Sequence, residues 1–95
     1  MPFFDCAMIC KALGDETRIK IFDMLKGGEL CACKILEKFK FSQPTLSYHM
    51  KILLSSGLIQ CTKQGKWCHY RINKDALDRL AEFINKPICE RKDLL

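Results

Sequence analysis

Apolar residues in the first part of the chain recur at the spacing of helices. In residues 3–13 they are Phe4, Ala7, Met8 and Ala12. Gly14 and Asp15 then interrupt the pattern, and Asp15 is suited to cap a second helix. The apolar positions of that helix are Ile19, Ile21, Phe22 and Leu25. Because two glycines follow at residues 27 and 28, we expect the second helix to end there.

The next apolar pattern predicts a short helix at roughly residues 30–38 and a longer one after it. Ser42 is a candidate N-cap, and Pro44 lies in the first turn, where a missing N–H costs little. The apolar stripe of the longer helix is Leu46, Met50, Leu53 and Leu54. We expect this helix to end near Ser55, because Gly57 follows.

After Gly57 the hydrophobic period changes from helical to two residues. Residues 58–63 and 67–72 read as two strands joined around residues 64–66. Asn73 can cap a final helix at about 74–86, and Pro87 follows it. Its apolar positions are Leu77, Leu80, Ala81 and Ile84. The fold class is therefore mainly α with a small β-hairpin, a winged helix-turn-helix.

Composition places the chain in one class of protein. Ninety-five residues form a single domain, 1–95, with a recognition helix at about 42–55 and a wing at about 58–72. The hydrophobic content of 48% excludes a disordered chain, and the net charge of +5 favours anionic partners such as nucleic acid. No secretory signal or transmembrane run is present, so we expect a cytoplasmic protein without a membrane partner.

The longer helix and the hairpin carry residue types that contact DNA. The candidate contacts are Ser42, Gln43, Pro44, Thr45, Ser47, Tyr48, His49, Lys51, Lys63, Lys66 and Arg71. A Gln43 amide can pair with adenine in the major groove, and the basic residues of the hairpin can contact phosphate. Alternatively, the hairpin is only a solvated basic turn. His49 lies close to the apolar stripe, so we expect it to be partly buried, with a phosphate contact left open.

Cys31 and Cys33 begin the short helix and are candidate ligands of a soft ion. Seven cysteines, an odd number, argue against a closed disulfide framework and indicate metal binding or redox sensing. A helix N-terminus lowers thiol pKa values, and thiolates select soft ions. In a regular helix the two side chains are about 200° apart, so capture of one ion would unwind the first turn and displace the recognition helix. Alternatively, both are small buried hydrophobes.

Taken together, these motifs closely resemble the ArsR/SmtB family of metal- and metalloid-responsive repressors. The segments that carry the resemblance are residues 15–18, 29–33, 42–53 and 56–59. The resemblance implies a winged-helix homodimer with the first and last helices (1 and 5) at its interface. It also implies repression at an operator in double-stranded DNA, relieved when As(III) or Sb(III) binds Cys31 and Cys33, with no organic cofactor.

The chain departs from the family pattern at one ligand position. Many arsenic-type members have a third cysteine where this chain has Leu36. The possible additional donors are Cys6, Cys10, Cys89 or a small exogenous ligand. The last helix contains no histidine, so the zinc-type site of other members is not expected.

The sequence is compatible with several other functions. The same fold could respond to Cd(II) or Pb(II), or to thiol oxidation and reactive sulfur species. Oxidation requires disulfide geometry, which is awkward at the Cys31–Cys33 spacing, whereas Cys33 with Cys89 or Cys10 with Cys31 stay open. A winged helix without an inducer is another alternative. An enzyme is not expected, because the chain lacks a Cys-x-x-Cys in a βαβ context and a glycine-rich cofactor loop. Cys61 and Cys68 are expected to be structural.

Overall fold

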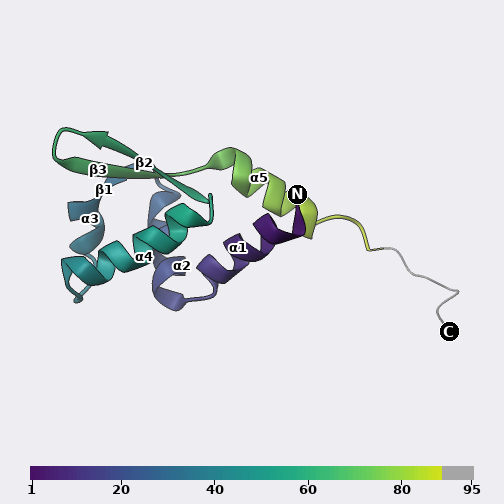
Figure 1. The fold of residues 1–95 in the computed structure, drawn as a ribbon, viewed down its shortest axis with the longest axis horizontal. Coiled ribbons are helices and arrows are strands. Elements are labelled where there is room, and N and C mark those ends of the chain that lie inside the picture. The colour runs from purple at the N-terminus through teal and green to yellow at the C-terminus, as the bar shows by residue number, and fades with distance from the viewer. Residues whose placement is uncertain (89–95) are drawn as a thin grey trace, which may run out of the picture.

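The computed structural model describes residues 1–88, and its element order agrees with the order expected from the sequence except for one additional short strand (Figure 1). The elements are α1 (Phe3–Leu13), α2 (Glu16–Leu25), β1 (Leu30–Cys31), α3 (Ala32–Leu36), α4 (Gln43–Ser55), β2 (Ile59–Gln64), β3 (Trp67–Ile72) and α5 (Lys74–Ile84). α2, α3 and α4 form the helix-turn-helix region, and β2 and β3 form the wing. The expected fold class is confirmed.

Three polar side chains define where the helices begin, as the sequence predicts. Asp15 Oδ2 accepts from the N–H of Arg18 at 3.1 Å and starts α2. Ser42 Oγ accepts from the N–H of Thr45 at 3.4 Å and starts α4. Asn73 Oδ1 accepts from Ala76 and starts α5. Each cap satisfies an N–H that has no partner within its helix, so the helix starts are encoded locally.

The sheet has one strand more than the expected hairpin. Its order is β1-β3-β2, and both pairs are antiparallel. β1 contributes only two residues, with Leu30 opposite Tyr70 and Cys31 opposite His69. A segment this short shows no periodicity of its own and becomes a strand only because β3 lies beside it. The expectation that the short helix begins near residue 30 is therefore wrong by two residues.

A single apolar core is formed by the sheet and all five helices. Its buried side chains are Ile9, Ala12, Ile21, Leu25, Ile35, Leu46, Met50, Leu53, Leu58, Ile59, Tyr70 and Leu80. The stripe expected on α4 is confirmed, with Leu54 partly buried beside it.

The stripes expected on α1 and α5 are only partly buried. Phe4 is 72% exposed and Ile84 is 64% exposed, although both belong to the apolar pattern of their helices. α1 and α5 lie side by side at the end of the molecule away from the wing tip (Figure 1), and the rings of Phe3 and Phe83 meet edge to face at 6.2 Å between centroids. These apolar residues therefore form an exposed surface and not part of the core.

Candidate nucleic-acid interface and thiol site

Helix α4, the candidate recognition helix, presents a polar face to solvent. Its exposed side chains are Gln43, Pro44, Ser47, Tyr48, Lys51 and Ser55, together with the capping residue Ser42. The Thr45 hydroxyl is hydrogen-bonded to Ser42 Oγ at 3.2 Å, so part of its hydrogen-bonding capacity is used within the cap. The buried stripe on the opposite side anchors the helix, so the polar face is held outward along its whole length.

His49 lies on the inner side of α4 and joins it to α2. Only 12% of its side chain is exposed, which confirms the partly buried histidine expected from the sequence. The Nη1 of Arg18 donates to His49 Nδ1 at 3.1 Å, and the Nε of Arg18 donates to the Ala12 carbonyl at 2.6 Å. Asp15 Oδ2 lies 4.0 Å from the same ring nitrogen. Because Nδ1 accepts a hydrogen bond, the neutral ring carries its proton on Nε2.

Arg18 is the residue in this region that the sequence did not single out. It links α1, α2 and α4 through one guanidinium, and its position in a capped first turn gave no sign of that role. His49, on the apolar edge of α4, could have indicated this role, because a buried histidine needs a polar partner.

The wing carries two kinds of basic residue. Lys63 and Lys66 are exposed near its tip, and no acidic side chain among residues 1–88 forms an ion pair with either of them. Arg71 is different, because its Nη1 donates to Thr62 Oγ1 and lies 3.9 Å from Glu29 Oε1. The two lysines are therefore available for an anionic partner, whereas the charge of Arg71 is already partly compensated.

Cys31 and Cys33 meet at the junction between β1 and α3. Cys31 ends β1 and is the N-cap residue of α3, with φ −78° and ψ 154°, while Cys33 is the second residue of that helix. Their Cα atoms are 5.4 Å apart, and a disulfide joins their sulfur atoms. Because the Cys31 backbone is extended, the two side chains converge instead of diverging as they would in a helix.

This geometry corrects two expectations. The two cysteines do not lie on opposite faces of a helix, so a single ion can reach both sulfurs without unwinding the first turn of α3. Their spacing is also compatible with disulfide geometry, because one of the two residues belongs to a strand.

A pocket of about 270 Å³ lies between Cys33, α4 and the wing. Cys33 and Leu36 line it from α3, Gln43 and Ser47 from α4, and Lys66 from the wing. Its remaining lining residues are Ala32, Leu46, Met50, Trp67, Cys68 and Tyr70. An occupant of the cysteine pair would thus lie beside candidate DNA contacts on both α4 and the wing.

Two other candidate donors, Cys6 and Cys10, lie on α1 and do not join this pair in a three-ligand group. Cys6 is partly buried and Cys10 exposed on α1; burial, together with the neighbouring Cys10 thiol, raises the pKa of Cys6. Across residues 1–88, no group of three or more His, Cys, Asp or Glu side chains is arranged to hold a metal ion. Cys89 lies outside the described residues.

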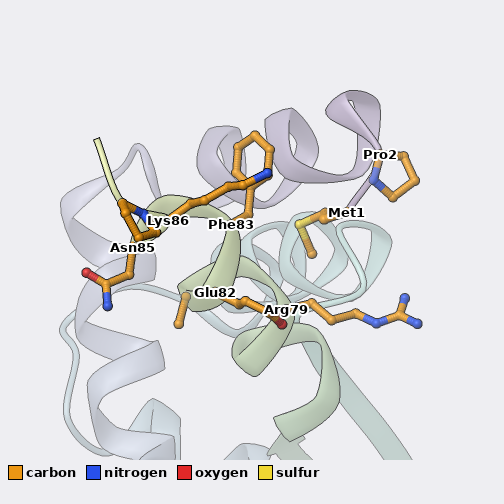
Figure 2. Close-up of a pocket in the computed structure, with 9 residues that line it drawn as sticks. Met1, Pro2, Arg79, Glu82, Phe83, Asn85 and Lys86 are labelled. Carbon is orange, nitrogen blue, oxygen red and sulfur yellow. The ribbon is translucent and has the colours of Figure 1, made fainter. Parts of the chain in front are cut away.

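A larger hollow lies between the start of the chain and the end of α5. It measures about 920 Å³. Figure 2 shows Met1 and Pro2 across from Phe83, with Arg79 and Lys86 at its sides. Its lining mixes the apolar side chains of Met1, Pro2 and Phe83 with the charged side chains of Arg79, Glu82 and Lys86.

A helix-turn-helix with an outward polar recognition helix and a basic wing defines a DNA-binding domain of the winged-helix class. The family described as "Bacterial regulatory protein, arsR family" matches residues 15–60. The arsenical resistance operon repressor of Staphylococcus aureus is 44% identical over 85 residues, covering 90% of this chain and 82% of the relative. The chain belongs to the ArsR family of DNA-binding transcriptional regulators, which confirms that it is not an enzyme.

Further relatives and solved structures agree with this assignment. A Staphylococcus aureus cadmium resistance transcriptional regulatory protein CadC homolog is 35% identical, covering 82% of this chain and 65% of the relative. A crystal structure of an ArsR family transcriptional regulator superposes with a TM-score of 0.79 at 25% identity, covering 84% and 88% of the two chains.

The homodimeric winged helix-turn-helix domain Mb0332 of Mycobacterium bovis matches with a TM-score of 0.73 at 25% identity, covering 93% of this chain and 89% of the other.

Within residues 1–88, no helix combines the length and apolarity needed to cross a bilayer.

Proposed function

We propose that the chain is a cytoplasmic transcriptional repressor that binds operator DNA as a homodimer and leaves it when As(III) or Sb(III) binds Cys31 and Cys33. The observation that carries the proposal is the convergence of these two sulfurs beside a pocket that Gln43 and Lys66 also line. The names of the arsenical resistance relatives support the class of inducer.

DNA recognition is assigned to α4 and the wing. The N-terminal turn of α4 exposes Gln43 for a base edge and Ser42, Ser47 and Lys51 for phosphate or base contacts. Lys63 and Lys66 supply phosphate contacts that make affinity depend on salt. His49 acts from inside by positioning α4, because its ring is already bonded to Arg18.

Homodimerisation is assigned to α1 and α5. Phe3 and Phe4 are 80% and 72% exposed, and Ile84 is 64% exposed. A short chain buries a limited fraction of its surface, and an exposed apolar patch of this kind marks an interaction site. The homodimeric structural neighbour supports this assignment. A dimer would place two recognition helices on the two halves of an inverted repeat.

Signal transfer runs through the β1–α3 junction. Ion binding requires the reduced thiols and holds Cys31 against Cys33, with a small exogenous ligand as third donor because Leu36 supplies none. Cys31 pairs with His69 of the wing strand, and Cys33 shares the pocket with Gln43. A change at the junction therefore reaches the wing and the recognition helix together, without unwinding α3.

A second candidate is the same repressor responding to thiol oxidation. The observation that favours it is the disulfide between Cys31 and Cys33. Cd(II) or Pb(II) is a further candidate inducer, supported by the cadmium resistance relative. All three versions use the same two sulfurs, so they differ in the signal and not in the site.

Titration of the reduced protein on DNA from upstream of its own gene separates these versions. Fluorescence anisotropy of the labelled DNA would follow release by As(III), Sb(III), Cd(II), Pb(II) and peroxide. We expect the trivalent metalloids to release DNA from the natural protein and from the C6S/C10S variant, but not from C31S/C33S. Release of C31S/C33S by As(III) would refute the proposal, and release of the natural protein by peroxide alone would select the oxidation version.

A further inference from the structure

A second pair of thiols lies in the wing, on other elements than Cys31 and Cys33, although Cys68 and Cys33 line the same pocket. Cys61 of β2 is opposite Tyr70, and Cys68 of β3 is opposite Lys63. Cys68 lies two residues before Tyr70, so it shares a sheet face with Tyr70 and Cys61. The two cysteines are therefore diagonal neighbours across the strand pair and not directly opposed residues.

The pair is partly buried, and one of its two cysteines borders the pocket beside α4. Both cysteines are partly buried, and Cys68 lines the 270 Å³ pocket together with Trp67. The pocket's other walls include the apolar side chains of Leu36, Leu46 and Met50. A ligand on these thiols could therefore place an apolar group next to them.

The chemistry of the pair favours a neutral ligand. Burial and the neighbouring Cys68 thiol raise the pKa of Cys61, and burial raises that of Tyr70 to about 12. The Cys61 thiol is thus protonated at neutral pH. A soft cation would have to bind deprotonated thiolates here. A ligand that carries hydroxide leaving groups would instead take up each thiol proton as water.

Diagonal spacing also favours a bridged pair over a disulfide. Diagonal cross-strand neighbours are about 7–8 Å apart between Cα atoms. A disulfide usually requires roughly 4.4–6.8 Å. When one atom bonds both sulfurs, the sulfurs stay further apart than in a disulfide. Such a bridge therefore spans the diagonal pair with less movement of the two strands.

We propose that Cys61 and Cys68 form a second thiol site that takes a trivalent organoarsenical, with its organic group in the pocket beside Trp67. A compound R–As(OH)₂ would exchange its two As–O bonds for As–S bonds to the two cysteines. Each thiol proton leaves with one hydroxide as water, so two waters are released and arsenic stays trivalent. The product is neutral. The site uses its own two sulfurs and does not require the inducer proposed for Cys31 and Cys33, although Cys33 lines the same pocket.

Trypsin offers a direct test with phenylarsonous acid as the probe. Cleavage after Lys63 and Lys66 separates Cys61, on peptide 52–63, from Cys68, on peptide 67–71. In the labelled natural protein, mass spectrometry should find these two peptides joined by one phenylarsenic group. Cys31 and Cys33 share the single peptide 27–34, so labelling of that pair cannot produce the joined species.

A variant isolates the wing pair from the other thiols. C6S/C10S/C31S/C33S retains Cys61, Cys68 and Cys89 and should bind one equivalent, quenching the fluorescence of Trp67, the only tryptophan. Adding C68S should abolish both changes. Absence of the joined peptides from the labelled natural protein, or their replacement by peptide 67–71 joined to the Cys89 peptide, would overturn the proposal. Because no operator is involved, the test is unaffected by failure of the proposed repressor function.

Discussion

Replacing Arg18 by alanine should destabilise the domain and loosen its recognition helix. The guanidinium donates to the Ala12 carbonyl at 2.6 Å and to His49 Nδ1 at 3.1 Å, so one side chain ties α1 and α4 to α2. A hydrogen bond to a charged group contributes about 1.5–3 kcal/mol. Because the site is only partly buried, water can replace some of this, and we expect a loss of about 2–3 kcal/mol for the two bonds.

Urea denaturation followed by far-ultraviolet circular dichroism measures this loss, at one fixed protein concentration. Lys20→Ala on the same helix is the matched control, because Lys20 is exposed and, within residues 1–88, pairs only with Glu16 at 3.4 Å, a contact that contributes about 0.3–0.5 kcal/mol. Affinity for the operator should fall as well, since His49 positions α4. If Arg18→Ala and Lys20→Ala cost the same, the assigned role of Arg18 would be refuted.

Three further predictions concern the wing and the core. Lys66→Ala should lower the salt slope of DNA affinity by about one, and Arg71→Ala should lower it less, because Arg71 is already paired within the protein; equal slopes would contradict this. Leu53→Ala should cost about 2–5 kcal/mol in thermal or urea unfolding, and more than Leu54→Ala, because Leu53 is fully buried. Tyr70, with a pKa of about 12, should stabilise the fold fully below about pH 10 and progressively less up to pH 12, because the unfolded phenol ionises first. Tyr70→Phe should remove this dependence of the urea midpoint on pH.

Features encoded within a few neighbouring residues could be read from the sequence alone. The caps at Asp15, Ser42 and Asn73, the change from helical to two-residue period, and the buried stripe of α4 are all local patterns, and the structure has them where they were expected. The ArsR-family assignment rests on the same kind of information, because its motifs are short segments that keep their order along the chain.

Long-range contacts decided the rest. Residues 30 and 31 become a strand only because β3, some forty residues later, lies beside them, and this extended backbone brings Cys31 to Cys33. The role of Arg18 also depends on distant residues, because its partners His49 and Ala12 lie on other helices. The periodicity of Phe4 and Ile84 predicts an apolar helix face, but it does not show what covers that face. Sequence thus determined the elements and the class of protein, whereas tertiary structure decided which side chains meet, because that depends on neighbours distant in the chain.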